Sequence, residues 1–155
     1  MYKKLIKWLL GFVIVMLSTY IVFFEVQTYL GKQALEATGL KRFEFSEALE
    51  LAKQNNKYVL TDMSAIWCPS CRKLDKQVFS NPDVKSVIEE HYIFSRVEYE
   101  SADGKTFMKK YGIKGFPTVL VIDGDGKKHF VVPPTYDPEL FIDYISDFIE
   151  LQKTS

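Results

Sequence analysis

The sequence predicts an α/β domain, with a mixed β-sheet flanked by helices, attached to an N-terminal transmembrane helix. Three observations predict it: an uncharged apolar run near the N-terminus, alternating helix and strand patterns beyond it, and two cysteines separated by two residues. With 155 residues, 47% of them hydrophobic, the chain is long enough for one domain with a hydrophobic core. Its formal net charge is zero, so no basic surface for nucleic acid is expected.

Residues 1–26 are predicted to form a membrane anchor. Residues 8–24 carry no charge, and with the apolar residues just before Lys7 the run approaches the roughly 20 that cross a bilayer. No small-residue cleavage pattern follows, so we expect an uncleaved anchor, with a cleaved signal peptide as the alternative. Lys3, Lys4 and Lys7 precede the run, which predicts a single-pass protein with its N-terminus in the cytoplasm.

Residues 27–42, mixed in polarity, are predicted to be a helical extension or a tether, and residues 43–155 the folded domain. Ser46 is a plausible N-cap for a first helix that the asparagine pair 55–56 ends. Residues 58–63 are largely apolar, as expected of a central strand. The next helix carries the cysteines; the Ser-Asn-Pro-Asp sequence at 80–83 interrupts it and a further helix follows.

The second half of the domain predicts the remaining elements. Residues 92–99 alternate like a strand, and a short helix follows around 106–111. Residues 118–122 are uniformly apolar after the first and predict a buried strand, which two Asp-Gly pairs connect to a hairpin strand at 128–132. Asp137, followed by Pro138, is a typical start for the final helix. The predicted order is therefore helix, strand, helix, strand, helix, strand, strand, helix.

Both cysteines lie in the stretch IWCPSCR, residues 66–72. Zinc would need four ligands, and beyond Cys68 and Cys71 only the two distant histidines remain, so no metal site is predicted. A structural disulfide would close a very small loop and gain little stability. Inert buried thiols are a further alternative, but Pro69 at a first helical position indicates that the cysteines straddle a helix start.

That placement suits thiol redox chemistry. With Cys68 at the helix N-cap, its sulfur faces free backbone amides and the positive end of the helix dipole, which stabilise a thiolate. Cys71, one turn later, can reach that sulfur and resolve a mixed disulfide. Cys68 is therefore expected to be the exposed nucleophile and Cys71 the resolving thiol.

Three separate motifs resemble the thioredoxin family. WCPSC at residues 67–71 resembles its W-C-x-x-C active site, GFPT at 115–118 its cis-proline loop, and Asp62 stands six residues before Cys68 like its buried aspartate. The stretches FSEAL before the first strand and CRKLDKQVFSNPDV after the motif are similar to the periplasmic C-terminal domain of DsbD-type thiol:disulfide interchange proteins. The resemblance covers about residues 43–151 and implies the thioredoxin fold.

The resemblance also implies roles for individual residues. The catalytic residues would be Cys68, Cys71 and Asp62, the last as a buried acid that exchanges protons with Cys71; a polar residue at an exposed strand end is the alternative. Arg96 is expected beside Asp62 unless the strand register slips. Pro117 would be cis, with a plain trans turn as the alternative, and its loop would pair with an extended peptide. Substrate contacts are expected from Trp67, Pro69, Ser70, Phe116 and Pro117, although Trp67 as a purely structural aromatic is a fair alternative.

The function implied is that of a membrane-anchored thiol:disulfide oxidoreductase on the periplasmic side of a bacterial inner membrane. It would reduce protein disulfides with no cofactor beyond its own Cys68–Cys71 pair, and protein thiols and disulfides would be its partners. Because the span has no cysteine, a separate membrane electron donor is expected. The alternatives are a cytochrome c maturation thiol reductase, whose usual R-x-E-x-P continuation residues 72–76 lack, and a non-catalytic tethered peptide-binding or chaperone module.

Overall fold

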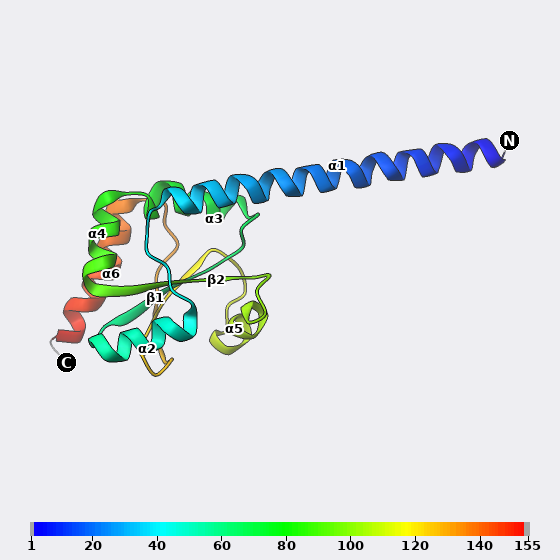
Figure 1. The fold of residues 1–155 in the computed structure, drawn as a ribbon. Helices are drawn as coiled ribbons and strands as arrows, with labels where there is room; N and C mark the ends of the chain where they lie inside the picture. The colour runs from blue at the N-terminus through cyan, green and yellow to red at the C-terminus, as the bar shows by residue number, and fades with distance from the viewer. Residues whose placement is uncertain (1, 154–155) are drawn as a thin grey trace.

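The structure, a computed structural model, describes residues 2–153 apart from the side chains at positions 3 and 5. The side chain of Lys3, one of the lysines behind the expected orientation, and the last two residues of the predicted domain therefore lie outside what the structure describes. One long helix projects from a small α/β domain (Figure 1).

That helix, α1, spans Tyr2–Ala37, a length of about 54 Å at 1.5 Å per residue. It is long and apolar enough to cross a membrane, and its side chains are exposed from position 8 to position 26. Residues 27–37, predicted as a helical extension or a tether, continue the same helix without interruption. The apolar segment and the domain are thus joined by regular helix.

The sheet has four strands in the order β2-β1-β3-β4. The strands are β1 Tyr58–Ser64, β2 Tyr92–Glu98, β3 Thr118–Ile122 and β4 Lys128–Val131. β1 pairs with β2 in parallel and with β3 antiparallel, and β3 pairs antiparallel with β4. All four predicted strands are confirmed, and their ends agree to within one residue. β1 therefore has a neighbour on each side, β2 and β3, and is not an edge strand.

The helices of the domain are α2 Phe45–Asn55, α3 Pro69–Leu74, the π-helical turn η1 Asp75–Phe79, α4 Pro82–His91, α5 Gly104–Tyr111 and α6 Pro138–Lys153. The predicted N-cap at Ser46 is wrong, because α2 begins at Phe45 with Glu44 in the capping position. The predicted cap at Asp137 is confirmed: its carboxylate accepts the backbone N–H groups of Glu139 and Leu140.

Two hydrophobic clusters cover the two faces of the sheet. Leu60 belongs to the cluster that includes α4 and α6, whereas Val59 and Met63 belong to the cluster that includes α2 and α5. This alternation follows from the two-residue repeat of a strand. Figure 1 shows β1 and β2 both running toward the side from which α1 projects. The residues that follow β1, which include the cysteines, therefore lie on that side of the domain.

Candidate active site

Cys68 occupies the N-cap of α3, as the sequence predicted. Its Sγ accepts the backbone N–H of Cys71 over 3.2 Å, and Pro69 follows as the first helical residue. Sγ also lies 3.0 Å from the hydroxyl oxygen of Ser70. Sγ therefore lies at the helix N-terminus, within reach of one backbone amide and one hydroxyl group.

Cys71 lies one turn later and is 1% exposed, and Cys68 is itself only 5% exposed. The expectation that Cys68 is exposed is therefore wrong: Trp67, Tyr99 and Phe116 pack against both cysteines. Both cysteines are free thiols in the structure. Burial raises the pKa of Cys71 far above its usual range, and the neighbouring Cys68 raises it further. Cys71 therefore holds its proton at neutral pH and needs a base before it can attack another sulfur.

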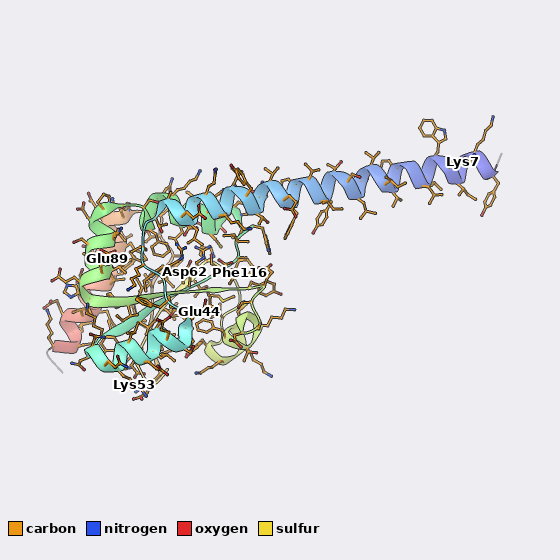
Figure 2. The ribbon with its side chains drawn as sticks, viewed as in Figure 1. Lys7, Glu44, Lys53, Asp62, Glu89 and Phe116 are labelled. Carbon is orange, nitrogen blue, oxygen red and sulfur yellow. The ribbon has the colours of Figure 1, made fainter. Side chains whose placement is uncertain are left out.

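Asp62 is a buried acid in the middle of β1, in the interior of the domain (Figure 2), and not at an exposed strand end. Neither of its carboxylate oxygens has a hydrogen-bond partner within residues 2–153. Burial raises the pKa of Asp62 to about 7 in spite of the opposing charge of Arg96. A buried carboxyl group without hydrogen bonds is rare, and this one can gain or lose a proton close to neutral pH.

Arg96 lies at the centre of a buried ionic cluster. It is the direct partner of Asp62 in the β1–β2 register, and its Nη1 lies 3.3 Å from Asp62 Oδ2. Shorter contacts join the same guanidinium to Asp75, at 2.8 Å, and Glu98, at 2.7 Å. The expected neighbourhood of Arg96 and Asp62 is confirmed, but Asp62 is the most distant of three carboxylates sharing one cation.

Asp75 and Glu98 are members of this cluster that sequence reasoning missed. Burial raises the pKa of Asp75, and the negative charges of Asp75 and Glu98 each raise the pKa of Asp62. Asp75 follows Cys71 by four residues, which places both on one side of a helix; that spacing was the available signal. Glu98 follows Arg96 by two residues on β2, so the two-residue repeat of a strand places both on one face; that alternation was the signal for Glu98.

Asp62 and Cys71 are electrostatically linked. The charge of Asp62 raises the pKa of Cys71, and the nearby hydroxyl of Ser64 lowers the pKa of both groups. Among residues with described side chains, no three His, Cys, Asp or Glu side chains are placed to hold a metal ion. The charge state of Asp62 and that of Cys71 therefore influence each other.

Aromatic side chains border the cysteines. Trp67 and Phe116 pack edge to face with ring centroids 5.8 Å apart, and Tyr99 lies 5.4 Å from Phe116. Trp67 Nε1 donates a hydrogen bond to Glu100, a partner that the sequence did not indicate. These three rings pack against Cys68 and Cys71.

The peptide bond between Phe116 and Pro117 is cis, as the resemblance implied. Pro117 lines a mostly apolar groove of about 200 Å³ that includes Leu74, Val119 and Tyr136. Ser70 is half-buried beside Cys68, whereas Pro69 is exposed. The structure thus gathers Cys68, Cys71, Trp67, Ser70 and Phe116, with Pro117 opening onto the adjacent groove.

Comparison with known proteins identifies the family. Residues 45–149 match the family described as a thioredoxin-like domain. The chain belongs to the thioredoxin-like family. It is 31% identical over 106 residues to thiol:disulfide interchange protein DsbD of Escherichia coli K12, covering 68% of this chain and 18% of that protein. A UBX domain-containing protein 7 homolog of Dictyostelium discoideum is 29% identical over 112 residues, 72% of this chain and 22% of that one. The chain therefore spans about a fifth of the length of these relatives.

Solved structures agree with this assignment. A DsbH oxidoreductase superposes with a TM-score of 0.61 at 22% identity, covering 75% of this chain and 86% of that one. A putative disulphide-isomerase of Bacteroides thetaiotaomicron superposes with a TM-score of 0.57 at 30% identity, covering 67% of this chain and 87% of that one. The oxidised C-terminal domain of Neisseria meningitidis DsbD superposes with a TM-score of 0.53 at 24% identity, covering 69% of this chain and 98% of that one. The predicted thioredoxin fold and the resemblance to the DsbD domain are confirmed.

Proposed function

We propose that this chain is a thiol:disulfide oxidoreductase that reduces protein disulfides by cycling Cys68 and Cys71 between dithiol and disulfide. α1 would anchor it in a bacterial inner membrane with the domain on the periplasmic side. The observation that carries the proposal is the pairing of Cys68 at a helix N-cap with a buried Cys71 linked to Asp62. The helix N-cap at Cys68, the burial of Cys71 and the raised pKa of Asp62 support these three proposed roles.

The first step is attack by the Cys68 thiolate on one sulfur of a substrate disulfide. The substrate S–S bond breaks, a mixed disulfide to Cys68 forms, and the other substrate sulfur leaves as a thiolate. The Cys71 backbone N–H donates a hydrogen bond to Cys68 Sγ, so the attacking sulfur lies against the first turn of α3.

In the second step Cys71 gives up its proton and attacks Cys68 Sγ. The mixed disulfide breaks, the second substrate sulfur leaves as a thiolate, and Cys68 and Cys71 become joined. Two electrons have then passed to the substrate. In this proposal Asp62, whose pKa is raised to about 7 by burial, accepts the Cys71 proton.

A dithiol on another protein restores the reduced pair by the same two steps in reverse. Because the apolar segment carries no cysteine, a separate membrane electron donor would supply that dithiol. Likeness to the DsbD C-terminal domain favours reduction over oxidation of substrates. The half-buried rings of Trp67 and Phe116 and the loop at Pro117 would hold the substrate segment, in the manner of strand addition.

Reduction of insulin by dithiothreitol, with the full-length chain in detergent, tests the proposal. The wild-type chain should accelerate insulin precipitation, and Cys68→Ala should remove the acceleration. Gln77→Ala is a matched control, since this exposed residue lies in the turn that follows α3 and outside the proposed site. Acceleration that persists in Cys68→Ala would leave only the non-catalytic peptide-binding alternative.

A further inference from the structure

Helix α1 extends beyond its apolar segment and packs directly on the stretch that carries Cys68. The Phe24 ring lies 6.0 Å from the Trp67 ring, and Gln27 Oε1 accepts a 2.7 Å hydrogen bond from Arg72 Nη1. Positions 24, 27 and 31 lie on one face of a helix, and the third, Gly31, meets the backbone of Ile66. One face of α1 therefore contacts residues on both sides of Cys68.

Gly31 makes the closest of these approaches. A Cβ atom at this position would overlap the carbonyl oxygen of Ile66, so any other residue would push the helix away from the domain. Ala34, about one turn further along, is also buried, at 2% exposure. Small residues thus let α1 lie against the backbone two residues before Cys68. This attachment is a packed contact and not a flexible linker.

The contact lies where the apolar segment ends. Phe24 is the last residue of the uncharged run, and Glu25 is the next residue. Gln27 and Gly31 follow within about two helical turns, or roughly 10 Å along the axis. If α1 crosses the bilayer, Trp67 is held at the level of the interface, where tryptophan is favoured.

The site also faces the membrane side of the domain. β1 and β2 run toward the side from which α1 projects (Figure 1), and Cys68 follows the end of β1. In Figure 2, Phe116 beside the site lies toward the projecting helix, while Glu89 and Lys53 lie toward the opposite side. A bilayer around α1 would therefore face the surface of the domain that carries Cys68.

We propose that α1 holds Cys68 at the bilayer surface and that its substrate is a disulfide of an integral membrane protein, exposed at that surface. This proposal rests on the redox function and membrane anchoring proposed above. A soluble folded protein would have to enter the space between the domain and the bilayer. A short loop of a membrane protein already lies at the height of Cys68, which raises its effective concentration there.

The position of Trp67 can be measured without any redox reaction. The chain has two tryptophans, so Trp8→Phe leaves Trp67 as the only one. In phosphatidylethanolamine and phosphatidylglycerol vesicles, a nitroxide on the lipid headgroup should quench its fluorescence more strongly than one at the acyl-chain end. Adding Gly31→Leu should weaken the quenching, whereas Gly11→Leu should not, because nothing lies within 4 Å of a Cβ at Gly11. An absence of headgroup quenching would overturn the proposed placement.

The substrate class is tested with two membrane peptides that share one apolar span. One carries a disulfide loop at the bilayer surface; the other carries the same loop beyond a helical spacer of about 40 Å. The pre-reduced full-length chain, in the same vesicles, should reduce the surface disulfide about tenfold faster. Gly31→Leu should bring the two rates close together while retaining insulin reduction in detergent.

The outcomes separate the two proposals. Equal rates for both peptides with the wild-type chain would overturn the membrane-substrate proposal and leave the redox function intact. Failure to reduce either peptide or insulin would reject the redox function itself. If Gly31→Leu loses insulin reduction through misfolding, Gln27→Ala, which removes the contact with Arg72, gives the same comparison with a milder change.

Discussion

Strand β1 has two halves with opposite character. In the first half, Val59 and Leu60 are fully buried and pack into the two hydrophobic clusters of the domain. In the second half, Asp62 and Ser64 are equally buried, yet their side-chain oxygens lack hydrogen-bond partners among the described residues. The two halves share one backbone geometry, but in the second half buried polar side chains stand on both sides of the apolar Met63.

This difference separates stability from reactivity within a single strand. Apolar burial in the first half stabilises the fold by about 25 cal/mol per Å². Each buried polar group there that lacks a hydrogen bond costs on the order of 1–3 kcal/mol, and for Asp62 the 3.3 Å ion pair with Arg96 offsets part of this cost. Such a cost is expected where a group must change its protonation state during a reaction. A carboxylate with all its hydrogen bonds made would stay ionised and could not accept a proton.

The largest expected effect on stability is in the apolar half. Leu60→Ala should lower the free energy of unfolding by about 2–5 kcal/mol, because it leaves a cavity in a packed core. The second step of disulfide reduction should keep its pH dependence, since Leu60 touches neither thiol. Urea unfolding of the full-length chain in detergent, together with insulin reduction, checks both parts. A changed pH profile would mean that the two halves of β1 are not separable.

Asp62→Asn should have the opposite effect on stability. Burial raises the pKa of Asp62 to about 7 from 3.8, so the folded state binds a proton that the unfolded state releases between these pH values. This contribution to stability is complete below about pH 4 and is lost as pH rises through about 7. At pH 8 the variant should therefore be more stable than wild type by up to about 4 kcal/mol.

The measurement is urea unfolding at a series of pH values. The difference between variant and wild type should grow from pH 4 to pH 8, because only the wild type has the carboxyl group that must ionise while buried. Asp143→Asn is a suitable control, since this residue lies in the last helix, far from β1 in sequence. A difference that stays constant with pH would contradict the raised pKa.

The same substitution should slow the second redox step. In wild type the rate at which Cys71 resolves a Cys68 mixed disulfide should rise with pH and level off above about 7, as the Asp62 carboxylate becomes available. Asp62→Asn should lose this inflection and be slower by about a hundredfold at pH 8. Stopped-flow measurement of release from a preformed mixed disulfide isolates this step. An unchanged pH profile would assign the proton to another group.

Much of the fold could be predicted because its signals are local. The four strands follow from short apolar or alternating runs between turn residues, and Pro69 and Asp137 mark helix starts through their own backbone chemistry. The predicted start of α2 was wrong because of a tertiary contact: the ring centroids of Phe45 and Phe107 lie 4.9 Å apart. That contact favours a helical residue at position 45 over a cap at Ser46.

The site was only partly predictable from the sequence. Local motifs located the cysteines, Pro117 and Asp62, because each stands in a short recognisable stretch. The approach of Asp75 to Arg96 depends on how the helix after Cys71 packs against the sheet, which no single segment determines. Glu98 was predictable in principle, because it stands two residues after Arg96 on the same strand. Gly31 was missed because a lone glycine in a helical pattern gives no sign of the backbone it approaches.

Mass spectrometry of trapped intermediates tests the central claim most directly. The full-length Cys71→Ala chain, incubated with a disulfide-bonded peptide, should accumulate one peptide adduct on Cys68, and Cys68→Ala should accumulate little on Cys71. Wild type should release the reduced peptide and end with Cys68 joined to Cys71. An adduct that forms on Cys71 as readily as on Cys68, or no adduct on either, would contradict the assignment of Cys68 as nucleophile.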